Sequence, residues 1–135
     1  MLPVGQTDSE QVFCHLLQTL RQRFPDGPPT RLALREALDD FAAQVRGYGP
    51  FNFLLSNGDC LFAHRSTQLH YLVRQAPFAV AHLKDQDVAV DFRELTTPAD
   101  RVALIATQPL TDNETWTPLP VDRVAMFADG AYCAE

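Results

Sequence analysis

The sequence predicts an α+β fold in which two helices precede a mostly antiparallel sheet. Apolar residues recur at helical spacing in the first third of the chain, whereas from Phe51 onward they gather in short runs. An Asn57-Gly58 pair separates two of these runs, which is a strong local signal for a β-hairpin. Helices followed by strands, rather than alternating with them, are typical of the α+β class. The length of 135 residues suits one domain, residues 1–135.

The first helix is expected to begin near Thr7 and to end before Pro25. Thr7 and Glu10 fit a capping box, in which each side chain satisfies a backbone N–H group of the first helical turn. The proline-rich segment 25–29 then stops the helix and turns the chain. The apolar stripe of this helix consists of Phe13, Leu16, Leu17, Leu20 and Phe24.

The second helix is expected to run from Thr30 to about Arg46, and Gly47 and Gly49 should end it. Its apolar stripe consists of Leu34, Leu38, Phe41, Ala42 and Val45. Both helices are amphipathic, so each should pack against other elements with one face only.

Short apolar runs mark the expected strands in the rest of the chain. They occupy residues 51–56, 60–64, 69–74, 78–82, 88–92, 102–107 and 124–128. The runs at 51–56 and 102–107 carry apolar side chains on both faces, which predicts a sheet that is covered on both sides. Prolines between residues 98 and 120 break the intervening chain into short pieces.

Composition excludes several classes of partner. The chain has 17 acidic and 11 basic residues, a net charge of −6, so it should repel a phosphate backbone and bind no nucleic acid. No apolar stretch approaches the length of a membrane span, so no membrane association is expected. The N-terminus lacks the charged and apolar regions of a signal peptide, which predicts a cytoplasmic protein.

The cysteines and histidines do not show the spacing of a disulfide framework or a metal site. Cys14, Cys60 and Cys133 are odd in number and form no C-x-x-C pair, so free thiols are expected. The four histidines form no H-x-H or H-E-x-x-H pattern, so a metal site would need tertiary proximity alone. We expect no metal and no cofactor.

Two polar clusters stand out. Residues 5–10, Gly-Gln-Thr-Asp-Ser-Glu, open the first helix. They can be interpreted as a plain helix cap, or as a site where Asp8 receives a ligand ammonium group beside the N–H groups of the first turn. Residues 105–116 run from the end of a strand, past a proline, to the only tryptophan, Trp116. By itself this second cluster indicates a strand stopped by proline, with Trp116 in the core.

The two clusters belong to a larger set of recognisable stretches. These are residues 3–10 (PVGQTDSE), 51–58 (FNFLLSNG), 76–78 (APF), 85–88 (DQDV) and 105–111 (IATQPLT), with Glu114 and Trp116. In this order they resemble the C-terminal half of a class II glutamine amidotransferase, of the stand-alone bacterial type related to γ-glutamyl amidases. The resemblance covers nearly the whole chain.

The resemblance implies part of an αββα N-terminal-nucleophile sandwich, in which two antiparallel sheets lie between helix layers. Members hydrolyse the amide of glutamine or a γ-glutamyl compound through a thioester on an N-terminal cysteine, whose free amine acts as the base. An Asn-Gly pair supplies the oxyanion hole. The aspartate of the T-D-S-E motif, here Asp8, binds the substrate's α-ammonium group. Thr7 and Trp116 are expected to neighbour it in the pocket.

This chain departs from the family pattern at the nucleophile. The cysteine should be residue 2, exposed by removal of Met1, but residue 2 is Leu2. All three cysteines have their amines in peptide bonds, and Asn57-Gly58 occupies a hairpin position rather than that of the oxyanion pair. We therefore expect the C-terminal portion of the domain, with no catalytic residue.

One consequence and two alternatives follow from this departure. Half a sandwich leaves sheet faces and strand edges uncovered, so the isolated chain should be unstable or self-associate unless a second polypeptide supplies the missing half. One alternative is a non-catalytic glutamine-binding or protein-interaction module derived from the same fold. The other is an unrelated α+β domain with chance matches to the motifs.

Overall fold

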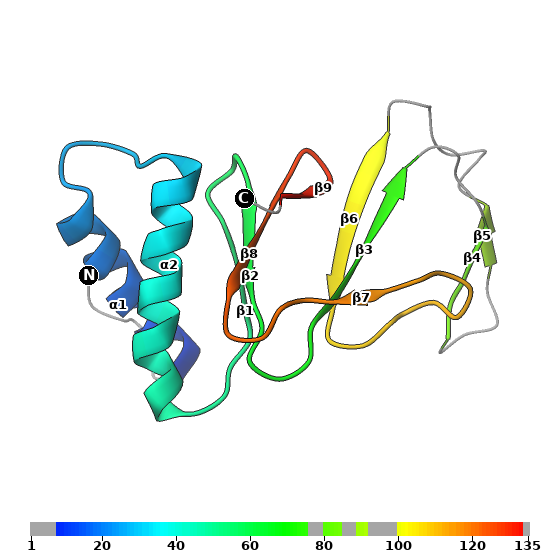
Figure 1. The fold of residues 1–135 in the computed structure, drawn as a ribbon, viewed down its shortest axis with the longest axis horizontal. Helices are drawn as coiled ribbons and strands as arrows, with labels where there is room; N and C mark the ends of the chain where they lie inside the picture. Colours follow the sequence, from blue (N-terminus) through cyan, green and yellow to red (C-terminus); the bar gives the residue numbers. More distant parts are fainter. Residues whose placement is uncertain (1–7, 76–79, 85–88, 92–99, 134–135) are drawn as a thin grey trace. The chain divides into compact units, whose positions relative to one another are not determined.

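The computed structural model describes residues 8–75, 80–84, 89–91 and 100–133. The chain divides into two compact units, Met1–Tyr48 and Gly49–Glu135. The first unit holds two helices and the second holds the strands (Figure 1). This order confirms the predicted α+β class.

Helix α1 spans Asp8–Arg23, close to its predicted bounds. Leu16 is buried together with Cys14, whereas Phe13 is 46% exposed. The prediction that Phe13 belongs to the buried stripe is therefore wrong. The smaller Cys14 side chain occupies the buried face instead, which helical periodicity alone had not indicated.

Helix α2 spans Arg31–Val45, and Thr30 caps it by accepting a hydrogen bond from the Ala33 N–H at 3.2 Å. The expected stripe is confirmed at Leu34, Leu38, Phe41 and Ala42, which are buried together with Ala37, whereas Val45 is half-buried. A short 3₁₀ helix, η1 (Arg46–Tyr48), follows. Within this unit, the ring of His15 on α1 lies 5.5 Å from that of Phe41 on α2.

The second unit contains a four-stranded antiparallel sheet. Its strands are β1 (Phe53–Ser56), β2 (Leu61–His64), β8 (Val124–Ala128) and β9 (Ala131–Cys133), in the order β1-β2-β8-β9. The predicted hairpin is confirmed, because β1 and β2 pair with Phe53 opposite His64. Gly58 in the turn adopts φ 89°, a conformation that favours glycine.

A second sheet has the order β6-β3-β7, and a separate hairpin joins β4 to β5. Their bounds are β3 (His70–Gln75), β4 (Val80–His82), β5 (Ala89–Asp91), β6 (Arg101–Ala106) and β7 (Thr117–Pro118). All are antiparallel. Strands β7 and β9 were not expected, because two or three residues are too few to show an alternating pattern.

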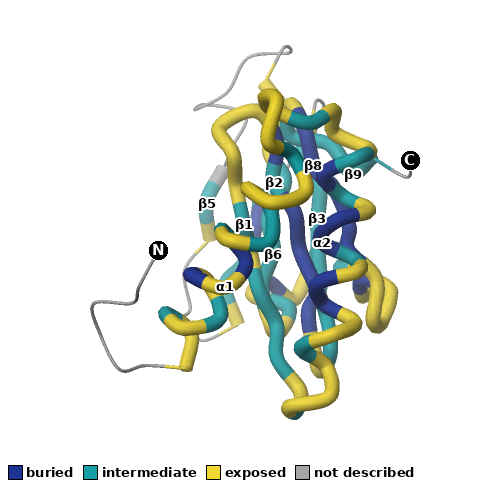
Figure 2. Tube along the Cα trace, turned by 90° about the vertical axis from the view of Figure 1, so that its left-hand side faces the viewer, coloured by how far each residue is buried: buried dark blue, intermediate teal, exposed yellow. Residues whose placement is uncertain are grey.

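The core of this unit lies where the two larger sheets face each other. Its buried residues are Ala63, Leu69, Leu119, Ala125 and Phe127, with Tyr71, Ala103, Ile105 and Tyr132 packed against them. The rings of Tyr71 and Tyr132, from different sheets, stack 5.0 Å apart. Every residue of β8 is buried (Figure 2).

Coverage of the sheets is less complete than the sequence suggests. On β1 the burial alternates, and Leu54 is 53% exposed. On β6, Val102 is 48% exposed. The prediction that the 51–56 and 102–107 strands are covered on both sides is therefore wrong at these positions.

Candidate functional site

An ion pair between Arg74 and Glu114 forms the centre of the polar cluster at residues 105–116. Arg74 Nε donates to Glu114 Oε2 at 2.9 Å, and Arg74 Nη2 donates to Glu114 Oε1 at 2.7 Å. The side chains are only 15% and 19% exposed. Successive residues of a strand face opposite sides. Since Tyr71 faces the core, Arg74 lies on the outer face of β3, and Glu114 meets it there.

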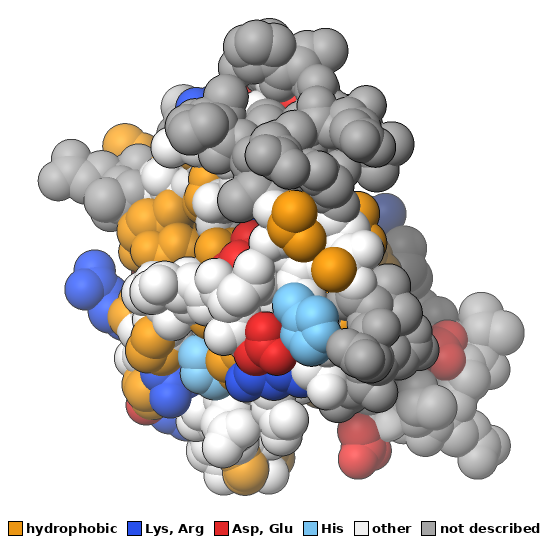
Figure 3. All heavy atoms as spheres, turned by 90° about the vertical axis from the view of Figure 1, so that its right-hand side faces the viewer, with side chains coloured by type: hydrophobic (Ala, Val, Ile, Leu, Met, Phe, Trp, Pro, Cys, Tyr) orange, Lys and Arg blue, Asp and Glu red, His pale blue; other side chains and the backbone are white. Residues whose placement is uncertain are grey.

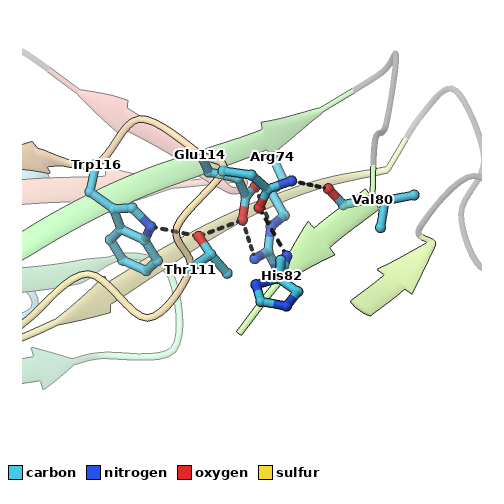
Figure 4. A network of polar contacts seen from close by, with 7 residues as sticks. Arg74, Val80, His82, Thr111, Glu114 and Trp116 are labelled. Carbon is cyan, nitrogen blue, oxygen red and sulfur yellow. Dashed lines mark hydrogen bonds and ion pairs between the residues drawn. The ribbon is translucent and has the colours of Figure 1, made fainter. Parts of the chain in front are cut away.

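Thr111 links this ion pair to the tryptophan. It is 1% exposed, and its hydroxyl donates to Glu114 Oε1 at 2.9 Å. Thr111 Oγ1 in turn accepts a hydrogen bond from Trp116 Nε1 at 2.9 Å (Figure 4). The indole N–H is the only polar group of a tryptophan side chain. Trp116 can therefore offer a ligand its ring surface, but not its N–H group.

The surroundings of Glu114 stabilise its charged form. The hydrogen bond from Arg74 is the main cause that lowers the pKa of Glu114 below its ordinary value, and burial opposes it. The hydrogen bond from Thr111 and the charge of Arg74 lower the pKa further. The carboxylate is therefore ionised at neutral pH and holds both Arg74 and Thr111.

The segment that contains Thr111 is also joined to β4. Asn113 accepts a hydrogen bond from the His82 N–H at 2.9 Å and donates one to the Val80 carbonyl at 2.6 Å. His82 Nδ1 lies 2.7 Å from Asp112 Oδ2. These two side chains are 36% and 49% exposed, and Figure 3 shows a histidine beside an acidic group on this face. A pair so accessible to water contributes little to stability.

The geometry of this network suits positioning rather than bond-making. The Thr111 hydroxyl both donates and accepts a hydrogen bond, and Glu114 is held by Arg74. Neither group is placed as a free nucleophile or base. The hydrogen bonds that link Arg74, Glu114, Thr111 and Trp116 instead fix the 107–116 segment against β3. Arg74 on β3 and Glu114 are forty residues apart in the sequence.

The Asn57-Gly58 pair serves as a turn. Asn57 Oδ1 accepts hydrogen bonds from the N–H groups of Asp59 at 2.9 Å and Cys60 at 3.0 Å. The Gly58 N–H donates to Ser56 Oγ at 3.1 Å. The backbone donor that an oxyanion hole would need is therefore already used, which agrees with the interpretation of this pair as a hairpin turn.

Asn52 is a structural residue that the sequence interpretation missed. Its Oδ1 accepts from the Ser66 N–H at 2.8 Å and the Thr67 N–H at 3.2 Å. Its Nδ2 donates to Thr67 Oγ1 at 3.0 Å and to the Gln68 carbonyl at 2.9 Å. Asn52 thereby attaches the start of β1 to the connection between β2 and β3. Only its place in the FNFLLSNG stretch could have singled it out.

The three predicted pocket residues are distributed over the two units. Asp8 is the first residue of α1 in the first unit and is exposed. Trp116 is half-buried in the second unit. Thr7 lies outside the described residues, as does the expected capping box that includes it. A pocket shared by these residues stays a prediction.

Other features bear on cofactor and membrane expectations. In the described ranges, no three His, Cys, Asp or Glu side chains gather where they could hold a metal ion. Within the described residues, Cys14, Cys60 and Cys133 form no disulfide bond. No helix among the described residues is long and apolar enough to cross a membrane.

Comparison with known proteins identifies the family. A family model described as glutamine amidotransferases class-II matches residues 1–135. The chain belongs to this family. The class II amidotransferase resemblance expected from the TDSE and ATQPLT stretches is thereby confirmed.

Individual relatives agree with this assignment. The chain is 48% identical over 128 residues to a candidate glutamine amidotransferase, YafJ, from Escherichia coli, covering 95% of this chain and 50% of YafJ. It is 40% identical over 133 residues to a candidate glutamine amidotransferase from Haemophilus influenzae, covering 98% of this chain and 45% of that protein.

A solved structure of a similar protein shares the fold. The crystal structure of a predicted glutamine amidotransferase from Pseudomonas aeruginosa superimposes with a TM-score of 0.84 at 44% identity. The match covers 100% of this chain and 53% of the Pseudomonas chain. The chain thus spans about half the length of the bacterial relatives it matches.

Proposed function

We propose that this chain is the C-terminal part of a glutamine-hydrolysing class II domain of the N-terminal-nucleophile hydrolase type. The reaction would be hydrolysis of glutamine or a γ-glutamyl amide through an N-terminal cysteine that lies outside this chain. The family match over residues 1–135, in a chain half as long as its relatives, carries this proposal. The protein would act in the cytoplasm, without metal or cofactor.

The cysteines of the chain itself support a role without bond-making. Cys14 is buried inside α1, Cys60 is buried directly before β2, and Cys133 lies within β9. Each carries its α-nitrogen in a peptide bond, so none has the free amine that serves as the base in this mechanism. No residue of the chain is therefore assigned to catalysis.

Asp8 is proposed to bind the α-ammonium group of the substrate, with Thr7 and Trp116 beside it. Asp8 is exposed at the first turn of α1, where its carboxylate is accessible to a cationic group. The indole N–H of Trp116 already donates a hydrogen bond to the Thr111 hydroxyl. Trp116 would accordingly contact the aliphatic part of a γ-glutamyl group through its ring.

Glutaminase measurements test this proposal. The chain alone should release no ammonia from glutamine, whereas the longer Pseudomonas protein should release it. In that longer protein, replacing the aspartate aligned with Asp8 by Ala should raise KM for glutamine. Replacement of the residue aligned with the exposed Asp26 provides the control. Turnover by the chain alone, or equal effects of the two substitutions, would contradict the proposed roles.

A second candidate is a glutamine-binding or interaction module without turnover. It differs from the first candidate in the expected absence of turnover, since neither candidate assigns a catalytic role to the cysteines of this chain. Isothermal titration with glutamine distinguishes the two candidates. Binding by this chain alone that Asp8→Ala abolishes, and that yields no glutamate, would support the module.

A further inference from the structure

The Asn57-Gly58 pair in the β1–β2 turn has a chemical reactivity that its role as a turn does not use. In such a pair the main-chain nitrogen of the glycine can attack the side-chain amide carbon of the asparagine and close a succinimide ring. Glycine favours this attack because it has no side chain to hinder the approach. Both residues are exposed, so water and hydroxide reach the turn. The other two asparagines, Asn52 and Asn113, precede residues with large side chains, which hinder the same ring closure.

The reaction needs water as its only co-reactant. The Gly58 N–H gives its proton to hydroxide, and the nitrogen then forms a bond to Asn57 Cγ. The side-chain nitrogen leaves as ammonia after water protonates it, which regenerates the hydroxide. Water then opens the ring at one of its two carbonyl carbons. Cleavage of the bond from nitrogen to Cγ gives aspartate, and cleavage of the bond from nitrogen to the main-chain carbonyl carbon gives isoaspartate.

In the folded turn, a hydrogen bond holds the attacking nitrogen. The Gly58 N–H donates to Ser56 Oγ at 3.1 Å, and the Ser56 hydroxyl is fixed in turn because it donates to the Cys60 carbonyl at 3.1 Å. Loss of the amide proton is a step that succinimide formation shares with base-catalysed hydrogen exchange, and hydrogen-bonded amides exchange slowly. The hydrogen bond to Ser56 should therefore slow both reactions at Gly58.

The carbon that is attacked is held as well. Asn57 Oδ1 accepts hydrogen bonds from the N–H groups of Asp59 at 2.9 Å and Cys60 at 3.0 Å. The main-chain N–H of Asn57 donates to the Cys60 carbonyl at 3.4 Å. Ring closure draws Cγ to bonding distance of the Gly58 nitrogen and therefore strains the two hydrogen bonds of Oδ1. Both reacting groups are thus restrained as long as the turn stays closed.

We propose that Asn57-Gly58 is a deamidation site whose reaction is slow in the closed β1–β2 turn and fast once the turn opens. Both reacting groups belong to the turn, so no other part of the chain has to move into place. Neither glutamine nor the N-terminal cysteine of the proposed function takes part. The reactivity of this site is therefore independent of glutaminase activity.

The two products should differ in their effect on the hairpin. Aspartate retains an oxygen in the place of Asn57 Oδ1, so the N–H groups of Asp59 and Cys60 keep their acceptor. Isoaspartate lengthens the main chain of the turn by one carbon, although Ser56 has to pair with Leu61 across it. Because turn length fixes the register of a hairpin, the isoaspartate form should not close again as the original hairpin.

Peptide mapping by mass spectrometry measures deamidation at each asparagine. The chain is incubated at mildly alkaline pH, once folded and once unfolded in guanidinium chloride. Asn57 should react at least about tenfold more slowly in the folded chain than in the unfolded one. Asn52 and Asn113 should react more slowly than Asn57 in the unfolded chain. Equal rates at Asn57 in the two states, or no reaction at Asn57 in the unfolded chain, would overturn the proposal.

Substitutions at Ser56 separate the hydrogen bond to Gly58 from general stability. Ser56→Ala should speed deamidation of the folded chain by about threefold to tenfold, the range expected for the loss of one neutral hydrogen bond. Ser56→Thr keeps the hydroxyl and should keep the slow rate. Ser66→Ala is the matched control, because Ser66 Oγ accepts a hydrogen bond from the Phe51 N–H at 2.7 Å outside the turn. Equal rates at Asn57 in Ser56→Ala and Ser66→Ala would contradict the proposed role of the turn.

Thermal unfolding of the separated products tests the effect on the hairpin. Chromatography separates the aspartate and isoaspartate forms of the reacted chain. The aspartate form and the Asn57→Asp variant should keep their Tm within about 2 °C of the unreacted chain, whereas the isoaspartate form should lose about 4 °C or more. An unchanged Tm of the isoaspartate form would refute the expected change of register.

Discussion

Replacing Glu114 with Gln is expected to destabilise the second unit substantially. The substitution preserves the size of the side chain but removes its charge and one of the two oxygen acceptors that Arg74 uses. Removing one partner of a fully buried ion pair costs about 3–5 kcal/mol, and of an exposed pair about 0–1 kcal/mol. With side chains 15% and 19% exposed, the Arg74–Glu114 pair lies nearer the buried limit. We expect a loss of about 3 kcal/mol in the free energy of unfolding.

The same segment of chain offers a matched control. The His82–Asp112 pair has the same 2.7 Å separation as Arg74 Nη2 and Glu114 Oε1, but its side chains are 36% and 49% exposed. Asp112→Asn should therefore cost no more than about 0.5 kcal/mol. Comparison of the two variants separates the effect of burial from that of distance.

Urea unfolding measures both variants. Trp116 is the only tryptophan, so its fluorescence reports on the second unit, and far-UV circular dichroism provides an independent midpoint. The Glu114→Gln variant should also show altered fluorescence in the folded state, because Thr111 joins Glu114 to the indole. Equal losses in the two variants, or a loss below about 1 kcal/mol for Glu114→Gln, would refute the assignment of the network as a stabilising clamp.

Three further outcomes are expected from the same structure. Because the folded-state pKa of Glu114 is lowered, its stabilisation is present above the ordinary carboxyl pKa and is lost as pH falls through the lowered value. Acid titration of the unfolding free energy should therefore fall less steeply in Glu114→Gln than in the unmodified chain. Gly130→Ala should lower the free energy of unfolding by about 2 kcal/mol or more, because φ of Gly130 is 72° and a Cβ there would lie 2.4 Å from the Arg101 carbonyl oxygen of β6. Gly47→Ala should leave the free energy of unfolding nearly unchanged, because a Cβ at Gly47 would meet no atom within 4 Å. Leu38→Ala, at a fully buried site of α2, should lower the free energy of unfolding by about 2–5 kcal/mol. Leu32→Ala, at a site that is 50% exposed, should lower it by less than about 0.5 kcal/mol. A similar loss from both substitutions would contradict the assignment of the buried face of α2.

Several parts of the fold could be predicted because they depend on neighbouring residues. Helix α2 begins where Thr30 can cap it and buries the expected stripe. The β1–β2 hairpin follows from the Asn57 side chain, which bonds the N–H groups two and three residues later. Strand β8 occupies the predicted residues 124–128. In each case the signal and the structure it specifies lie within a few residues.

The contacts of the candidate site, by contrast, could not be predicted from neighbouring residues. Glu114 and Trp116 were singled out only as part of the recognised sequence stretches, and Trp116 was expected to line the substrate pocket. Their observed contacts depend on Arg74, forty positions before Glu114, and on the buried hydroxyl of Thr111. No local pattern indicates a pairing over such a separation, because it arises only when β3 and the 107–116 segment meet.

The sequence alone determined the start of α2 at Thr30, the hairpin turn, the order of helices and strands, and the family to which the motifs point. These properties follow from short-range hydrogen bonding, side-chain periodicity and characteristic strings of residues. Only the tertiary structure decided which strands lie at sheet edges, why Phe13, Leu54 and Val102 are exposed, and how Asn52 and Arg74 are used. Those properties depend on which distant segments pack together, and burial and ion pairing are set by that packing rather than by the residues next in the chain.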